Sequence, residues 1–221
     1  MKNQSVILNF ALAIVIVVLS FRLISAFDAG TKQTKEDDKT VLPTEGKEVG
    51  DGFVTFDVMK DFNENPFTFF TGHGLLLCAG DKEGANAMTI GWGALGTLWS
   101  KPSMTVYVRH GRYTHQFMER GRYFTVMKFD DNKVVDYMGT HSGRDGDKAK
   151  ALGLTLAYTK NGAPYYKEAN MVIECRLMSA NDFTEKCFRD DVPREIYSNT
   201  NDDGGMHTEY VGEVVSAVKK K

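Results

Sequence analysis

The stretch NAMTIGWGALGTLWSKPSMTVYVR, Asn86 to Arg109, combines β-forming residues with three glycines. Its second part, Ser103 to Arg109, alternates apolar and polar residues and predicts a strand. The glycines at 91, 93 and 96 are unexpected there, because each adds backbone entropy and packs no side chain. Glycines within strands often mark places where a ligand or another backbone approaches closely. We therefore interpret this stretch as β-structure beside a binding site.

The turn that follows supports this interpretation. Arg109, Arg112 and Thr114 precede the sequence HQFMERG, which predicts a short helix ending at Gly121. The start of a helix offers free N–H groups and positive potential, and arginine adds a planar, bidentate grip on phosphate. On the other side of the glycines, a strand edge near Asn86 can hydrogen-bond a flat, polar-rimmed ring. A phosphorylated flavin fits both features.

The remaining pattern predicts a mainly β domain with short helices. We expect further strands over 52–57, 67–81, 123–129, 170–180 and 207–220, and helices over 132–139 and from 147 to about 153. Regular crossover helices do not separate these strands, so a doubly wound parallel sheet is excluded. The sequence therefore predicts a mostly antiparallel β-barrel or sandwich with helical insertions.

Four blocks of sequence, in order, resemble one known family. They are the segment NAMT, the Pro-led strand with its Arg-Tyr-Thr turn, SGRDGDKAKALGLT (Ser142 to Thr155) and HTEYVGEVV (His207 to Val215). Together they cover most of Phe53 to Val218. The chain is similar to the flavin reductase family, flavoredoxin included, whose fold is an FMN-binding split barrel.

This resemblance implies non-covalent FMN in a groove at a homodimer interface. Residues 86–89 would line the isoalloxazine, and the arginine turn would hold the phosphate. Ser142, Lys148 and His207 would lie around the cofactor or the nicotinamide. The implied cofactor-binding residues are Asn86, Ala87, Met88, Thr89, Arg109, Arg112, Thr114, Ser142, Lys148 and His207. No residue is assigned a catalytic role, because the flavin carries the chemistry.

Three functions are compatible with these features. The first is a flavin reductase that transfers hydride from NAD(P)H to FMN and passes electrons to an acceptor. The second is a non-enzymatic FMN-binding electron carrier, reduced by a partner redox protein. The third is a structural barrel without FMN, in which the arginine turn is idle. We expect His73 and His141 to be structural and Trp99 to be a core aromatic.

Charge and residue spacing argue against other classes of function. The net charge of -2 gives no general basic field for nucleic acid. Cys78, Cys175 and Cys187 form no metal-binding spacing, and neither a metal site nor a Ser–His–Asp arrangement stands out. An exported chain can form a disulfide between Cys175 and Cys187. We favour the interpretation that all three cysteines are small buried side chains.

The N-terminus predicts export. Lys2, the apolar run from Val6 to Phe21 and the small residues up to Ala26 have the layout of a signal peptide. The run is shorter than the roughly 20 residues that span a bilayer, so we favour cleavage over an N-terminal anchor. Residues 1–26 are thus a signal peptide or anchor, 27–52 a flexible polar spacer and 53–221 the split-barrel domain. We expect a periplasmic or outer-face location, with membrane contact only if the segment stays uncleaved.

Overall fold

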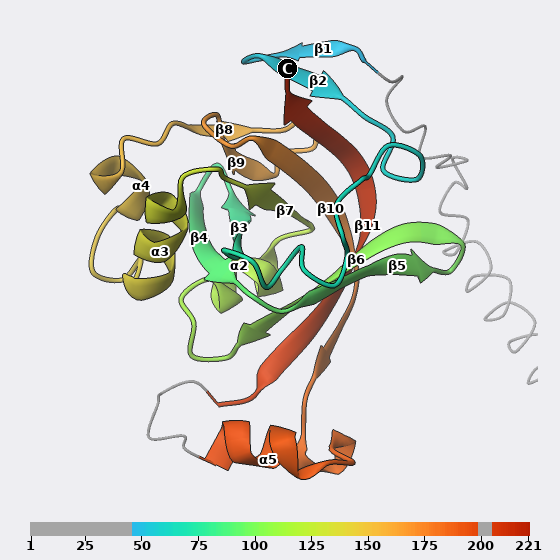
Figure 1. Cartoon of the computed structure of the whole chain (residues 1–221). Coiled ribbons are helices and arrows are strands. Elements are labelled where there is room, and N and C mark those ends of the chain that lie inside the picture. The colour runs from blue at the N-terminus through green and yellow to red at the C-terminus, as the bar shows by residue number, and fades with distance from the viewer. Residues whose placement is uncertain (1–45, 199–204) are drawn as a thin grey trace, which may run out of the picture. The chain divides into compact units, whose positions relative to one another are not determined.

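The computed structural model describes residues 46–198 and 205–221, which form a curled antiparallel sheet with a few short helices (Figure 1). The strands are β1 (Glu48–Gly50), β2 (Phe53–Thr55), β3 (Leu75–Asp81), β4 (Gly84–Ile90), β5 (Gly93–Leu98), β6 (Lys101–Arg109), β7 (Tyr123–Lys128), β8 (Leu156–Tyr158), β9 (Pro164–Tyr166), β10 (Met171–Asp182) and β11 (His207–Lys220). The helices are α2 (His115–Arg120), α3 (Asn132–Thr140), α4 (Lys148–Ala151), the 3-10 turn η1 (Glu185–Cys187) and α5 (Asp191–Ser198).

The sheet is built around β11. Its strand order is β1-β2-β11-β10-β7-β3-β4, and β6 joins it by pairing with both β11 and β5. Every pairing is antiparallel, including the separate β8–β9 ribbon. The β10–β11 ladder shifts register between Glu174 and Cys175 and again between Leu177 and Ser179, and such bulges bend a sheet. The predicted mainly β, mostly antiparallel split barrel is confirmed.

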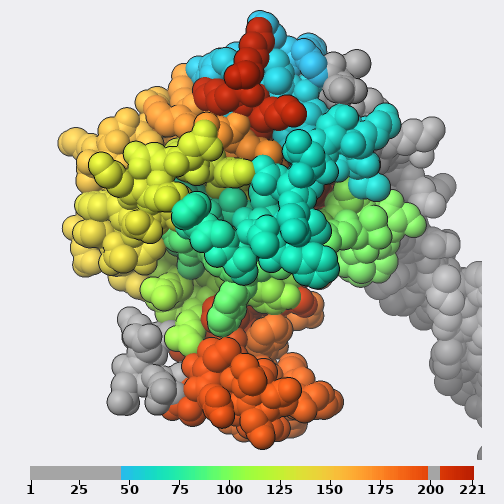
Figure 2. All heavy atoms as spheres, in the orientation of Figure 1, coloured from blue at the N-terminus to red at the C-terminus, as the bar shows by residue number. Residues whose placement is uncertain are grey.

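Strand β3 shows how the two faces of the sheet are filled. Leu75 and Leu77 belong to one buried cluster, whereas Leu76 and Cys78 belong to another, as the two-residue period of a strand requires. The segment 56–74, teal in Figure 2, lies over the first cluster with Phe56, Phe69 and Phe70. On the other face, helix α3 contributes Val134, Val135 and Met138 to the second cluster.

The glycines of the opening stretch have different roles. A Cβ on Gly93 would lie 2.2 Å from the ring of Phe70, so this glycine makes room for a core side chain rather than for a ligand. Gly96 faces open space, with no atom within 4 Å of a Cβ placed there. Gly91 lies in the break between β4 and β5 and lines a pocket described below.

Several expected boundaries need correction. The segment 67–74 forms turns, and the strand starts only at Leu75, because Asn65 caps the turn through its side chain and Phe69 and Phe70 are used in the core. Strand β1 lies inside the stretch 27–52 that was expected to be a spacer, and it pairs with β2. Trp99 is 66% exposed, not a core aromatic, because it stands in the tight β5–β6 turn with φ of 51°.

The sequence analysis missed β8, β9, η1 and α5. The predictions for residues 1–45 lie outside the described residues. Within the described ranges, none of the helices combines the length and the apolar character needed to cross a membrane.

Candidate functional site

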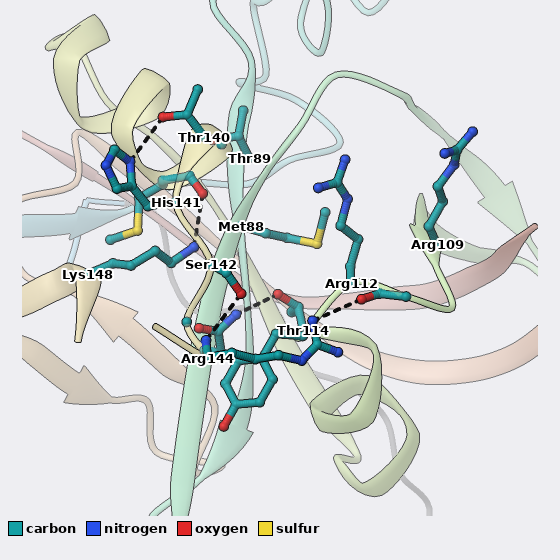
Figure 3. A pocket seen from close by; sticks show the side chains of 16 residues that line it. Met88, Thr89, Arg109, Arg112, Thr114, Thr140, His141, Ser142, Arg144 and Lys148 are labelled. Atoms are coloured by element: carbon teal, nitrogen blue, oxygen red, sulfur yellow. Dashed lines mark hydrogen bonds between the residues drawn. The ribbon is translucent and has the colours of Figure 1, made fainter. Parts of the chain in front are cut away.

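A pocket opens between β4, the turn after β6 and the loop after α3 (Figure 3). Its volume is about 200 Å³. The residues that line it are Asn86, Met88, Thr89, Arg109, Gly111, Arg112, Tyr113, Thr114, Met138, Gly139, Thr140, His141, Ser142, Gly143, Arg144 and Lys148. Three segments far apart in the sequence thus form one site.

Close packing holds the three segments together. A Cβ on Gly143 would lie 2.1 Å from Oδ1 of Asn86, so only glycine lets the loop come this near to β4. The amide of Asn86 donates to Oγ1 of Thr114 at 2.7 Å, which ties β4 to the turn. The guanidinium of Arg144 donates to the Gly111 carbonyl at 3.1 Å and thereby joins the loop to the same turn.

Two hydroxyl groups in the pocket have their protons available. Oγ1 of Thr114 accepts from Asn86, and Oγ of Ser142 accepts from the backbone N–H of Arg144. No described residue accepts the proton of either hydroxyl. Since a hydroxyl has one donor and two acceptor positions, both groups can donate to a bound ligand.

The charge of the pocket has one sign. Arg109, Arg112, Arg144 and Lys148 all line it, and no carboxylate does. The exposed Arg112 side chain makes no hydrogen bond to any residue that the structure describes. In Figure 3 it extends beside Arg109 on the open side of the site. Cations and hydroxyl donors together suit the binding of an anion.

Lys148 is the buried cation. Its side chain is only 7% exposed, and its Nζ donates to the carbonyls of Ala87 at 2.7 Å and Met138 at 2.9 Å. An ammonium group has three protons, so one donor remains. Burial lowers the pKa of Lys148 from 10.5 to about 8, and Arg112 adds to that effect, whereas Cys78 opposes it. Lys148 is therefore mostly charged at neutral pH.

A second pocket, of about 360 Å³, adjoins the first. The two share Met88, Thr89, Arg109 and Arg112. The second pocket is also lined by Ile90, Gly91, Trp92, Tyr107, Ile196 and His207. It therefore offers flat and apolar surfaces next to the cationic pocket. The first pocket is small by itself, but side by side the two have the 300–1,000 Å³ that small-molecule sites occupy.

His207 is held between aromatic rings. Its Nδ1 lies 2.7 Å from the Tyr197 hydroxyl, and its ring centroid lies 5.1 Å from that of Trp92. Burial, together with the charges of Arg109 and Arg112, lowers the pKa of His207 from 6.5 to about 4. The imidazole is therefore neutral at pH 7.

The structure brings the residues implied by sequence into one region. Asn86, Met88, Thr89, Arg109, Arg112, Thr114, Ser142 and Lys148 line the first pocket, and His207 lines the second. Ala87 is buried, and its carbonyl holds Lys148. The sequence analysis missed Arg144, although it stands in the quoted block SGRD.

His141 also lines the pocket, and its ring stacks on Tyr137 at 3.8 Å. The stacked ring fits the structural role expected for His141, whereas its place in the lining of the pocket was not expected. All three cysteines are free; Cys78 and Cys175 are buried, whereas Cys187 is exposed, against the expectation of three buried side chains.

Comparison with known proteins adds independent evidence. The model of the flavin reductase like domain family matches residues 68–221. The chain is similar in structure to flavoredoxin from Methanosarcina acetivorans, with 24% identity, a TM-score of 0.53, and coverage of 67% of this chain and 68% of the other. It is also similar to an FMN-binding protein from Thermus thermophilus, with 21% identity, a TM-score of 0.52, and coverage of 75% of this chain and 79% of the other. An FMN-binding domain of a flavin reductases-like enzyme from Shewanella baltica has 16% identity and a TM-score of 0.53, with coverage of 78% of this chain and 80% of the other. A search of curated proteins finds no match.

The fold is that of a flavin reductase-like split barrel. The family match covers well over half of the chain, so the protein belongs to the flavin reductase like domain family.

Proposed function

We propose that this protein binds FMN non-covalently in the two adjoining pockets and is an NAD(P)H-dependent flavin reductase. The observation that carries the proposal is the cationic, hydroxyl-rich pocket without carboxylates beside a flatter, more apolar one. A phosphorylated ring system needs both surfaces. The similarity in fold to FMN-binding proteins supports the same cofactor.

The donor set fits the phosphate end of FMN. Arg112, Thr114 and Ser142 each keep a donor that no described residue accepts. Lys148 keeps one ammonium proton and a positive charge at neutral pH. We assign these four side chains to the cofactor, with Arg109 at the junction of the two pockets.

The second pocket suits the isoalloxazine. Residues 88–91 form one wall, and Trp92 and the neutral His207 contribute rings. When bound, FMN accepts hydride from a reduced nicotinamide and passes electrons on. The residues of the chain orient the rings and place positive charge near them; no proton transfer by a side chain is required.

Anaerobic mixing of the FMN-loaded protein with NADH or NADPH tests the activity. Rapid bleaching of the flavin absorbance supports the reductase. Bound FMN that neither nucleotide bleaches supports the electron carrier, which a partner redox protein would reduce. That alternative draws on the predicted export of the chain, because NAD(P)H is scarce outside the cytoplasm. No binding of FMN would contradict both.

Two further features belong to this proposal. We place the protein outside the cytoplasm, on the basis of residues 1–26. We also propose a homodimer, since the family resemblance implies a flavin groove shared between subunits.

A further inference from the structure

Three side chains that can bind a metal meet where strands β6 and β10 end, outside the two pockets. They are His110 in the turn after β6, His115 at the start of α2, and Asp182 at the end of β10. One ring nitrogen of each histidine and one carboxylate oxygen of Asp182 all lie within 4.8 Å of one another. We infer that these residues form a site for a divalent transition-metal ion, with Zn²⁺ as the best match. The inference does not depend on flavin binding.

The spacing suits a tetrahedral ion. Nε2 of His110 lies 3.1 Å from Oδ1 of Asp182. Two ligands on a tetrahedral zinc ion, each about 2.0–2.1 Å from the metal, lie about 3.3 Å apart. These two side chains would therefore need little movement, and His115 completes three protein ligands from within 4.8 Å.

The backbone and a buried hydroxyl hold the ligands in place. Asp182 pairs with Thr208 in the β10–β11 ladder, and the Thr208 hydroxyl donates to Oδ1 of Asp182 at 2.5 Å. The same hydroxyl lies 2.9 Å from Nε2 of His115. Thr208 is 2% exposed. Such outer contacts orient metal ligands, and here one threonine orients two of them.

The chemistry favours zinc over a simple surface ion pair or a harder cation. Two imidazoles and a carboxylate are common zinc ligands, whereas Ca²⁺ and Mg²⁺ prefer oxygen alone. A carboxylate oxygen has two lone pairs, so Oδ1 of Asp182 can accept from Thr208 and also bind an ion. His110 and Asp182 are exposed, which leaves room for water as the fourth ligand.

The site would act on the neighbouring turn. His110 and His115 stand on either side of Arg112 and Thr114, which line the cationic pocket. An ion bound to both histidines and to Asp182 would fasten this turn to the end of β10. Metal binding should therefore raise the melting temperature, since a ligand that binds only the folded state stabilises it.

The test is a titration of the flavin-free full chain, stripped with a chelator, with ZnCl₂ in a calorimeter and with Co²⁺ in a spectrophotometer. We expect one ion per chain and the strong visible absorbance of tetrahedral Co²⁺. His110→Ala and Asp182→Asn, both at exposed positions, should each weaken zinc binding at least tenfold. His73→Ala removes an exposed histidine outside the cluster and should change nothing.

Two outcomes would overturn the inference. One is the absence of stoichiometric zinc or cobalt binding by the wild-type chain. The other is binding that persists in both ligand variants; its loss in Cys187→Ser would assign it to the exposed thiol instead. Because no flavin is present, neither outcome bears on the proposed reductase activity.

Discussion

At the scale of single residues, the pocket contains side chains that hold one contact to the protein and keep another for a ligand. Thr114 and Ser142 accept a hydrogen bond and retain their own protons. Lys148 donates to two carbonyls and retains a third proton. This division fixes each group in place before a ligand arrives, so little conformational entropy remains to be lost on binding.

Arg112 differs from these residues because its side chain makes no hydrogen bond or ion pair with a described residue. Arg112→Ala should weaken the binding of FMN by about 1.5–3 kcal/mol, the value of a charge-assisted hydrogen bond. It should leave the binding of riboflavin nearly unchanged. Arg112→Lys should recover only part, because lysine lacks the planar fork. Fluorescence titration with both flavins measures the difference.

The matched control is Arg194→Ala, which removes an exposed arginine paired with Asp191 on α5. It should affect neither flavin. An equal loss of FMN and riboflavin in Arg112→Ala would make Arg112 structural, with Arg109 as the next candidate for the phosphate.

His207 gives a prediction for acid stability. Its pKa is about 4 in the folded chain and 6.5 in the unfolded one, so the unfolded state binds more protons between these values. The stability that it contributes is present above pH 6.5 and is lost as the pH falls towards 4. Between pH 7.5 and 5 we expect a loss of the order of 1–2 kcal/mol, after allowance for partial exposure.

Urea unfolding of the flavin-free chain at several pH values measures this loss. His207→Gln should reduce the pH dependence by that amount, whereas His73→Gln, at an exposed position, should leave it as in the wild type. Identical slopes for wild type and His207→Gln would show that the histidine is not held neutral by the fold.

Local sequence could indicate some of these residues but not their contacts. The arginine turn was visible because Arg109, Arg112 and Thr114 are adjacent to a helix start. The partnership of Lys148 with the Ala87 carbonyl spans 61 positions, and no periodicity encodes it. The place of His141 at the pocket was not predicted for the same reason, since the loop after α3 faces β4 only in the folded chain.

At the scale of elements, the loop after α3 determines the shape of the site. Gly143 sits against Asn86 and Tyr113, at distances that no Cβ could occupy. Gly143→Ala should push the loop away from β4 and break its alignment with Thr114. The binding of FMN and of riboflavin should each weaken by about 1–3 kcal/mol, the typical cost of overpacking. Loss of both flavins separates this change from Arg112→Ala.

Gly96→Ala provides the control, because a Cβ there meets nothing within 4 Å. Crystal structures or amide exchange of both variants would show whether the loop moves. Full flavin affinity in Gly143→Ala would mean that the loop does not form a wall of the site.

Elements with a clear period were predicted well, and those without one were not. Strand β11 has the bounds expected from its alternating residues, His207–Lys220. Strands β8 and β9 have three residues each, too few for a pattern. Helix α5 has a proline at 193 and follows a polar stretch, which resembles a loop. Trp99 was misplaced because hydrophobicity alone does not show that a residue occupies a turn.

At the scale of the whole molecule, we propose self-association, and several large aromatic and apolar side chains are exposed. Phe67, Trp99, Met59 and Trp92 are 88%, 66%, 60% and 49% exposed, and large exposed apolar groups often mark interfaces. We expect a homodimer, twice the chain mass of 24.7 kDa, in light scattering of the full chain with bound detergent subtracted. A monomer that binds FMN tightly would contradict the shared groove.

The central position of β11 has a consequence for how the protein is made. This strand pairs with β2, β6 and β10, yet it follows all three of them in the chain. Until it is made, β6 and β10 have no strand between them, and their edges stay unpaired. The sheet can therefore close only after residues 207–220 have been made, and a chain truncated before His207 would be handled by chaperones and proteases as unfolded.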